Sequence, residues 1–552
     1  MEKVSIQDFY VGRSIFITGA TGFMGKVLVE KLLRSCPGID RVYLLIRPKT
    51  DKDVRFRLQE MIKCKLFEWQ RQNQPDALKK LVPISGDVSL PDLGISFSDM
   101  QELVANVSVV FHSAARVKFD DDLRSAINSN VKGPKRVATF CRQLKDLKAL
   151  VHVSTTYNNL EKEDIDEEIY PTSLDPQKLL DLVDCMDDKL LASITKQDTS
   201  GRLVGTSPNV YAYTKALGEH LLQDLTFESG KQRLPLAIVR PSMVTAAVQE
   251  PLPGWIDNFN GPSGTLAGTS KGLIQIVRVD PELIADIIPV DFPINLMIAA
   301  AWDEATCCAN KSSDQIRVYN CSSGSLNPII WRDFRNWGLG GVHEFPCKEI
   351  MRYPNIKLQT NRLLFNIEIV LYHHVPALFF DTIALLCGRK PFVARLFKRA
   401  HKMMSCLEFY TMREWNFPSQ NPVLLMDKMS VQEKNTFNFD VRKIDWETYM
   451  TTFAVGVREY LFKDDLSSIH AARKNLNRMK LLRMVVRCVI LGLMLLFFYV
   501  LWTKFTTETS SIVSFLFQNR YNSSTVQDIF ENETFCGLKS THILPLKSAL
   551  EL

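Results

Sequence analysis

The stretch "SIFITGATGFMGKVLVEKLLR", from Ser14 to Arg34, combines a short apolar run, three glycines spaced three apart and a helical pattern. Gly19 lets the chain turn off a strand, Gly22 allows the backbone to approach a pyrophosphate, and Gly25 lets the helix lie close to the sheet. The N-terminus of that helix then faces the anion. This order predicts the first strand and helix of a dinucleotide-binding domain.

Further apolar runs, rich in β-branched residues, alternate with helical stretches as far as Pro241. They are Val42–Ile46, Leu81–Ser85, Val107–Ser113, Leu150–Ser154 and Leu236–Arg240. Such near-continuous apolar strands are typical of a parallel sheet that helices cover on both faces. The predicted fold class is therefore α/β, with a doubly wound parallel Rossmann sheet and a substrate subdomain.

After Pro241 the regular alternation fades. Gly254–Gly268 ("GWIDNFNGPSGTLAG") has the glycine and proline content of a loop, and we expect it on the substrate side. Between Trp331 and Lys463 the pattern turns helical and aromatic. We predict a dinucleotide-binding domain with its substrate subdomain at 1–330, a mostly helical C-terminal domain at 331–465, a basic segment at 466–487, a membrane helix at 488–504 and a tail at 505–552.

Composition excludes several classes of protein. With 552 residues, 46% of them hydrophobic, the chain exceeds what one core needs. A net charge of +6 is too dilute to indicate a nucleic-acid partner. The twelve cysteines form neither a CxxC pair nor a spacing suited to zinc, so we predict no metal site.

The first residues, "MEKVSIQDFY", lack the layout of a secretory signal, and we expect the bulk of the chain in the reducing cytosol.

Near the C-terminus, Cys488–Thr503 carries no charged residue. Sixteen helical residues rise about 24 Å, slightly less than a bilayer core of about 30 Å. The flanking Arg487 and Lys504 can extend their charged ends to the interface, which makes a span feasible. The alternatives are a buried core helix and a re-entrant hairpin that returns through Ser511–Phe517.

The segment before this apolar run is strongly basic, with Arg473, Lys474, Arg478, Lys480, Arg483 and Arg487. Because positive flanks stay in the cytoplasm, we expect the large folded part on that side. The tail carries two glycosylation sequons, at Asn522 and Asn532, which would then be lumenal.

Residues near the strand ends predict which dinucleotide binds. Arg47 and Lys49 follow the second strand and suit a ribose 2′-phosphate, which favours NADPH; the alternative is a solvated basic turn. Asp87 can accept a hydrogen bond from adenine or serve as a turn aspartate. Ala114 and Ala115 are small enough for a cofactor to pass over the strand end. The predicted cofactor-binding residues are Thr18, Gly19, Thr21, Gly22, Phe23, Met24, Gly25, Arg47, Lys49, Asp87, Ala114, Ala115 and Lys215.

The catalytic candidates follow the fifth strand. Tyr211 and Lys215 are four apart on a helical pattern and project from one face. An ammonium beside a phenol lowers its pKa toward neutrality, as a proton donor to an alkoxide requires. A hydroxyl of Ser154, Thr155 or Thr156 would complete the polarisation of a carbonyl, and we favour the two threonines. The alternative for the Tyr–Lys pair is an ordinary surface contact on a helix.

Taken together, the motifs resemble the extended short-chain dehydrogenases/reductases and, more narrowly, the fatty acyl-CoA reductases. The resemblance covers about Gly12 to Lys463. It rests on "TGATGFMGKVLVEKLLRSCP", "FHSAARVKFDDDL", "VHVSTTYNN", "NVYAYTKALGE", "IVRPSMV", "GWIDNFNGP", "IPVDFPIN", "YNCSSGSLNPI", "REWNFPSQN" and "FNFDVRKIDWETYMTTFAVGVREYL".

This resemblance implies the NADPH-dependent reduction of long-chain or very-long-chain fatty acyl-CoA to a primary alcohol, by two hydride transfers with release of CoA. It implies that Tyr211 and the hydroxyls of Ser154–Thr156 steady the oxyanion, and that Tyr211 later protonates the alkoxide. Lys215 would also hold the nicotinamide ribose. Asn130 resembles the structural asparagine of the superfamily.

The implied partners are a fatty acyl-CoA and the lipid bilayer, and an oligomer is compatible with the sequence. A membrane helix suits an amphiphilic product. We expect the endoplasmic reticulum, with the catalytic domain cytosolic, and rank the peroxisomal membrane second because the final "SALEL" does not match a peroxisomal signal. Ile369–Phe380 is interpreted as part of an acyl-chain path, as an interfacial helix or as core packing.

Two other functions remain open. Another extended reductase or epimerase, acting on a sterol or a nucleotide sugar, explains the first 240 residues equally well. A non-catalytic, NADP-binding membrane scaffold could dispense with Tyr211 and Lys215, so their joint presence argues against it.

Overall fold

The computed structural model describes residues 4–48, 53–119, 121–172, 174–191, 207–308 and 315–521. Met1–Met479 forms one compact unit and Lys480–Leu552 a second. Lys49 and both sequons, at Asn522 and Asn532, lie outside the described residues.

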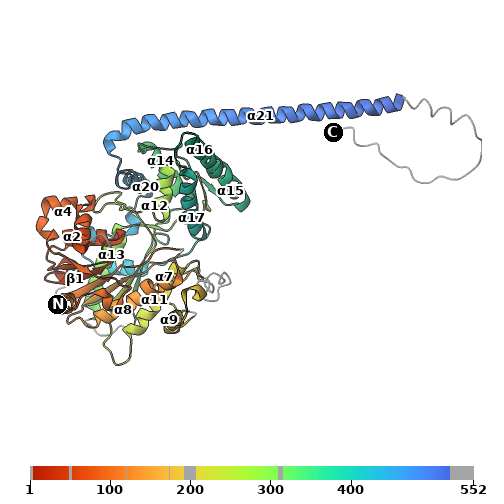
Figure 1. Cartoon of the computed structure of the whole chain (residues 1–552). Coiled ribbons are helices and arrows are strands. Elements are labelled where there is room, and N and C mark those ends of the chain that lie inside the picture. The colour runs from red at the N-terminus through yellow and green to blue at the C-terminus, as the bar shows by residue number, and fades with distance from the viewer. Residues whose placement is uncertain are drawn as a thin grey trace, which may run out of the picture. The chain divides into compact units, whose positions relative to one another are not determined.

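A seven-stranded parallel sheet forms the centre of the first unit (Figure 1). Its strand order is β10-β6-β5-β4-β1-β2-β3. The bounds are β1 Ser14–Thr18, β2 Val42–Ile46, β3 Leu81–Ser85, β4 Val107–His112, β5 Ala149–Val153, β6 Leu236–Pro241 and β10 Arg317–Cys321. The six predicted strands are confirmed to within one residue at each end. The seventh, β10, was missed because "RVYNC" is half polar, and it pairs with β6 along its whole length.

Both faces of the sheet are covered, as the apolar strands predict. In β1, Ile15 and Ile17 pack into one core and Phe16 into the other. The first core holds helices α2 (Phe23–Ser35) and α13 (Asp291–Cys308), and the second holds α6 (Phe97–Asn106), α8 (Lys132–Cys141) and α11 (Val210–Thr226) (Figure 1). The chain winds outward from β1 in both directions, so the strand order reverses between β1 and β4. Ligands of doubly wound sheets bind at the carboxyl ends of the strands at such a point.

Shorter elements connect this framework. They are α1 Ile6–Phe9, α3 Val54–Lys63, α4 Glu68–Asn73, α5 Pro75–Leu78, α7 Leu123–Asn130, α9 Pro176–Cys185 and α12 Gly261–Ser270, with small sheets of β7 Met243–Thr245 with β9 Ile287–Pro289 and of β8 Ile276–Arg278 with β11 Lys357–Gln359. The loop predicted at Gly254–Gly268 is wrong in its second half, because α12 begins at Gly261 with Pro262 in its first turn, where a proline is well tolerated.

The C-terminal part of the unit is mostly helical, as predicted. Its helices are α14 Trp331–Glu344, α15 Arg362–Ile369, η4 Val370–His374, α16 Val375–Leu386, α17 Val393–Thr411, α18 Gln420–Asp427, α19 Val431–Thr436 and α20 Trp446–Gly456. They pack tightly against the sheet domain: a Cβ on Gly456 would overlap the carbonyl group of Gly254. The Tyr449 hydroxyl also donates to the Ala246 carbonyl oxygen at 2.8 Å. The predicted division at 330/331 stays a prediction.

Among the described residues, two stretches of helix are long and apolar enough to cross a membrane. The first, Arg362–Leu386, joins α15, η4 and α16, and its side chains are mostly exposed; Leu378 is 71% exposed and Leu386 is 83% exposed. Core packing is therefore the wrong interpretation for most of Ile369–Phe380.

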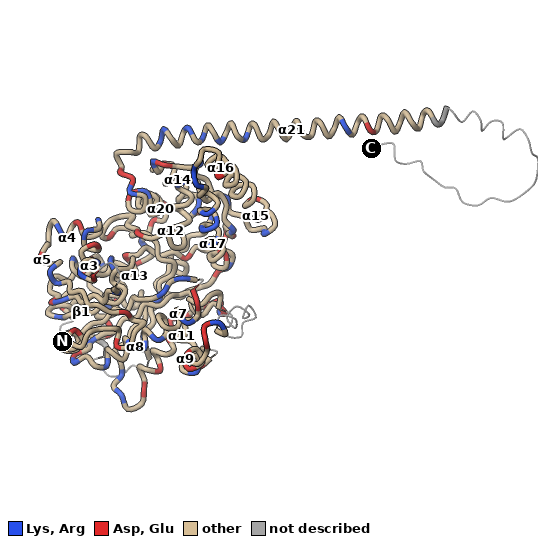
Figure 2. Tube along the Cα trace, in the orientation of Figure 1, with Lys and Arg blue, Asp and Glu red and all other residues tan. Residues whose placement is uncertain are grey.

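The second is helix α21, Ile469–Tyr521, which includes the predicted span at 488–504. Figure 2 marks the positions of Lys and Arg along its first half, followed by a long stretch without charge. The helix runs unbroken through Ser511–Phe517, so the tail predicted at 505–552 begins as helix.

Candidate active site

A cleft of about 780 Å³ opens at the carboxyl ends of β1 and β4, where the strand order reverses. Most of the predicted site residues line it: Gly19, Thr21, Gly22, Phe23, Met24, Gly25, Arg47, Asp87, Ala114, Ala115, Ser154, Thr155, Tyr211 and Lys215. Thr18 and Thr156 do not. The fold thus brings residues from six separate parts of the sequence to one cavity.

The glycine turn has the shape that a bound pyrophosphate requires. Gly19 adopts a φ of +75°, and a Cβ there would lie 2.8 Å from the backbone of Ser113. A Cβ on Gly25 would overlap the carbonyl oxygen of Gly19, so only glycine allows α2 to pack this closely. Gly22 is the N-cap of α2 and has no side chain to occupy the first N–H groups. These groups suit a phosphate at the helix N-terminus.

Thr18 supports the site from within the sheet. It is fully buried, its Oγ1 lies 2.7 Å from His112 Nδ1, and it accepts a hydrogen bond from the Ala114 backbone N–H at 3.2 Å. Burial lowers the pKa of His112 to about 3, with a further contribution from Lys215. The imidazole is therefore neutral, and the pair holds the ends of β1 and β4 in register.

Two arginines lie at the end of β2, one predicted and one missed. Arg47 pairs with Asp87, with 2.6 Å between Nε and Oδ2, and remains 54% exposed. Arg57, on α3, donates to the carbonyl oxygen of Arg47 and to Thr21 Oγ1 at 3.4 Å. Both arginines line the cleft. The available sequence signal was a further arginine ten positions after Arg47, in the first turn of α3.

Helix α11 presents the predicted tyrosine and lysine to the cleft. Its N-cap Asn209 accepts from the Ala212 backbone N–H at 2.9 Å, which fixes where the helix begins. One turn on, Lys215 Nζ donates to the carbonyl oxygen of Val153 at 2.7 Å, at the end of β5. Lys215 is therefore tied to the strand that carries the candidate hydroxyls.

Burial shifts the pKa of both groups. It lowers the pKa of Lys215 to about 8, although the nearby Glu219 carboxylate opposes this shift. Burial also raises the pKa of Tyr211, and the neighbouring Tyr410 adds to the effect. The expected lowering of the Tyr211 pKa is absent, because the cost of burying a phenolate exceeds any attraction to the ammonium. The phenol therefore holds its proton at neutral pH.

The three neighbouring hydroxyls separate into two groups. Ser154 and Thr155 line the cleft, whereas Thr156 is fully buried outside it. Thr155 Oγ1 accepts from the Tyr157 backbone N–H at 3.2 Å, and Ser154 Oγ has no hydrogen-bond partner among the described residues. The placement thus favours Ser154 and Thr155 over Thr156 as partners of a bound carbonyl.

Tyr410, near the end of α17, reaches the site from the helical part of the chain and was missed. Its hydroxyl accepts from Asn209 Nδ2 at 2.7 Å. Its ring packs against Phe119 and Tyr157, with centroids 5.7 and 5.2 Å apart. An aromatic wall therefore closes the cleft beside Tyr211, whose ring lies 6.0 Å from that of Phe119.

A buried ion pair anchors α11 behind the site. Arg240 and Glu219 are 0% and 1% exposed, and Arg240 Nε lies 2.9 Å from Glu219 Oε1. Asn158 donates to the same carboxylate at 2.7 Å. Asn130 donates to Thr214 Oγ1 at 3.1 Å and to the Arg116 carbonyl oxygen at 3.2 Å, which joins α7 to α11.

Comparison with known proteins agrees with this geometry. The NAD-binding and sterile domain models, both described as Male sterility protein, match residues 17–297 and 372–464. Fatty acyl-CoA reductase 1 of Xenopus laevis is 40% identical over 480 residues, which cover 87% of this chain and 90% of that protein. The human protein of the same name is 38% identical with the same coverage. Fatty acyl-CoA reductase 2 of Bos taurus is 38% identical over 86% of this chain and 90% of its own length.

Two solved structures share the fold at lower identity. They are the terminal R domain from the myxalamid PKS-NRPS biosynthetic pathway, with a TM-score of 0.53 and 17% identity, and the reductase domain of a nonribosomal peptide synthetase from Mycobacterium tuberculosis, with 0.52 and 19%. Each match covers 82% of this chain and 92% of the other. An NAD-binding domain model thus matches the region that holds the glycine turn, and the chain belongs to the fatty acyl-CoA reductase family.

Proposed function

We propose that this protein reduces long-chain or very-long-chain fatty acyl-CoA to the primary alcohol, using two NADPH and releasing CoA. The observation that carries the proposal is the joint presence of Tyr211, Lys215 and the glycine turn in one cleft of a chain from this family. A nucleotide-sugar epimerase would leave the helical part of the chain unexplained. A scaffold without turnover would need neither the tyrosine nor the lysine.

The residues of the cleft fit a dinucleotide. The glycine turn leaves a cradle that a Cβ would fill, and α2 points its first N–H groups into the same space. Arg47 and Arg57 supply positive charge at the end of β2, which favours NADPH over NADH because a 2′-phosphate binds guanidinium groups well. When bound, the reduced nicotinamide supplies the hydride for the carbonyl carbon.

Tyr211 and a hydroxyl of Ser154 or Thr155 would hydrogen-bond the thioester oxygen and stabilise its developing negative charge. Collapse of this tetrahedral species re-forms the carbonyl, breaks the carbon–sulfur bond and expels CoA thiolate, leaving the aldehyde. In the second reduction the same groups hold the aldehyde oxygen. Tyr211 then gives its proton to the alkoxide, which its raised pKa allows because the phenol is protonated at the outset.

Lys215 would act on both steps through its charge. A pKa of about 8 leaves it mostly protonated at pH 7, so an ammonium one helix turn from Tyr211 would favour the phenolate as the phenol loses its proton. The same ammonium can donate to a ribose hydroxyl. Tyr410 and Phe119 exclude water from the reacting carbonyl.

We propose that the chain is a membrane protein with its catalytic unit in the cytosol, at the endoplasmic reticulum first and the peroxisomal membrane second. The uncharged part of α21 around 488–504 supports the anchor, and the basic residues at 466–487 support its orientation. The exposed apolar face of Arg362–Leu386 supports a further contact with lipid.

We retain the division into an NADP-binding domain with substrate subdomain at 1–330 and a helical domain at 331–465. The two family matches, 17–297 and 372–464, lie on either side of this boundary.

The test is the stoichiometry of the reaction in full-length, detergent-solubilised protein. We expect about two NADPH consumed per CoA released, with fatty alcohol as the lipid product. Tyr211→Phe should lower kcat by about 10²–10⁴-fold, the usual contribution of a general acid, while NADPH still binds. Tyr213→Phe is the matched control, because Tyr213 packs with Leu217 in a separate core. A ratio near one with aldehyde as product, or full activity in Tyr211→Phe, would contradict the proposal.

A further inference from the structure

A second cavity, of about 320 Å³, adjoins the active-site cleft. The two share four lining residues: Met243, Pro262, Leu407 and Tyr410. Tyr410 is held at this junction by its hydrogen bond to Asn209, the N-cap of the helix that carries Tyr211. A molecule that reaches past Tyr410 therefore enters the second cavity directly from the reaction centre.

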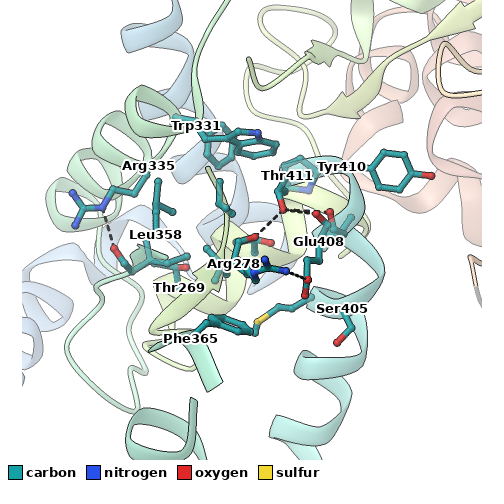
Figure 3. Close-up of a pocket in the computed structure, with 18 of the residues that line it drawn as sticks. Thr269, Arg278, Trp331, Arg335, Leu358, Phe365, Ser405, Glu408, Tyr410 and Thr411 are labelled. Carbon is teal, nitrogen blue, oxygen red and sulfur yellow. Dashed lines mark hydrogen bonds and ion pairs between the residues drawn. The ribbon is translucent and has the colours of Figure 1, made fainter. Parts of the chain in front are cut away.

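The wall of this cavity is mostly apolar. It is built by α12, α14, α15, α17 and strand β8, and Figure 3 shows Trp331, Leu358 and Phe365 around its interior. The other apolar lining residues are Leu266, Val277, Val279, Phe334, Leu339, Ile356, Ile369 and Met404. Apolar surface of this extent favours a hydrocarbon ligand, because each buried methylene is worth about 0.8 kcal/mol.

Three of the four charged residues of the wall have partners within the protein. Arg278 pairs with Glu408, and Thr411 Oγ1 donates to the Arg278 carbonyl oxygen at 2.8 Å (Figure 3). Arg335 donates from Nε to the Ile356 carbonyl oxygen at 3.0 Å. The fourth charged lining residue, Arg362, lies exposed at the start of α15. The interior of the cavity therefore presents mostly apolar surface and suits an uncharged chain.

We propose that this second cavity holds the acyl chain of the substrate, and so sets the preferred chain length. The assignment rests on the proposed function. With the thioester carbonyl beside Tyr211, one end of the substrate is apolar and the other carries the CoA phosphates. The apolar cavity beyond Tyr410 accepts the acyl end of the substrate. The CoA end then lies in the open part of the cleft, near the dinucleotide.

Two positions allow the cavity to be shortened without removing a hydrogen bond in the described structure. Thr269 is buried in α12, and its Oγ1 has no partner among the described residues. Ser405 is exposed on α17 and lines the same cavity as Phe365 and Met404. Lys398, exposed on the same helix, does not line the cavity and gives a matched control.

The first experiment compares kcat/KM for stearoyl-CoA and decanoyl-CoA in the full-length protein. In Thr269→Phe and Ser405→Phe the ratio should fall by about fourfold for each methylene displaced, thus about sixtyfold for three. Activity on decanoyl-CoA and NADPH binding should persist, and Lys398→Phe should keep the wild-type ratio. If Thr269→Phe does not fold, Ser405→Phe carries the test alone. An unchanged ratio in a folded variant overturns the assignment.

The second experiment needs no turnover. An acyl-CoA with a diazirine near its methyl end is photolysed with the wild-type protein and NADP⁺, and the labelled peptides are mapped by mass spectrometry. We expect label on peptides that contain Phe365 or Met404; label confined to other segments overturns the assignment. Label at these peptides in a protein that reduces no acyl-CoA would contradict the proposed function and keep the cavity as an acyl site.

Discussion

Replacement of the buried active-site lysine, Lys215→Met, should stabilise the folded protein while abolishing its activity. Lys215 is 2% exposed, and burial lowers its pKa from 10.5 to about 8. The difference corresponds to about 3.4 kcal/mol by which the folded state disfavours the ammonium at pH 7. Loss of the hydrogen bond to the Val153 carbonyl oxygen costs about 1 kcal/mol. Methionine keeps the stem packing, so the net gain is about 2 kcal/mol.

The assay is the thermal unfolding midpoint of the full-length protein in detergent, without dinucleotide. Residues 1–479 form the compact unit, and about 2.1 cal/mol/K per residue gives an unfolding entropy of about 1 kcal/mol/K. The midpoint of Lys215→Met should therefore rise by about 2 °C at pH 7.

The pH dependence of the stability difference between wild type and Lys215→Met provides a second, independent test. Between pH 8 and 10.5 the unfolded chain keeps the proton on Lys215 while the folded chain has lost it. Because the unfolded state then binds more protons, the stability of the wild-type protein increases with pH relative to the variant. The difference between the two midpoints should therefore narrow above pH 8. Lys231→Met, at an exposed lysine paired with Glu228, should show neither effect. A variant less stable than wild type at pH 7, or a difference independent of pH, would refute the reasoning.

Three further predictions concern the cofactor, the reaction and the fold. Arg47→Ser should lower kcat/KM for NADPH about 10- to 100-fold and leave that for NADH nearly unchanged, because it removes a charge-assisted contact to the 2′-phosphate; an equal loss with both would contradict this. The kcat/KM of the wild-type enzyme should fall as pH rises through about 8, where Lys215 loses its proton, and a profile flat to pH 10 would exclude a role for the ammonium. Arg240→Met should lower the free energy of unfolding, measured by chemical denaturation, by about 3–5 kcal/mol, because it leaves the Glu219 carboxylate buried without its cation. The double variant that also carries Glu219→Leu should recover part of this loss.

The strands and the glycine turn could be predicted from the sequence because their signals are local. Ile15, Phe16 and Ile17 are consecutive apolar residues that belong to opposite faces of one strand, which is the pattern of a sheet covered on both sides. The spacing of Gly19 and Gly25 is equally local, since the helix must pass against the strand that precedes it.

What could not be predicted depends on distant parts of the chain. Tyr410 enters the cleft from α17, and no local pattern relates it to Asn209, which lies about 200 positions earlier in the sequence. The direction of the Tyr211 pKa shift depends on how deeply the fold buries the phenol, which spacing to Lys215 does not reveal. The sequence analysis favoured Thr156 together with Thr155, but the path of the chain after β5 turns Thr156 away from the cleft and places Ser154 in its lining.

The most direct test of the central claim uses NADPH that carries two deuterium atoms at C4 of its nicotinamide, together with a saturated long-chain acyl-CoA. If one cleft performs both reductions, the alcohol released will carry two deuterium atoms at C1 for each CoA freed, and Tyr211→Phe will form almost none of it. An aldehyde with a single deuterium as the end product, or an alcohol without deuterium at C1, would contradict the account.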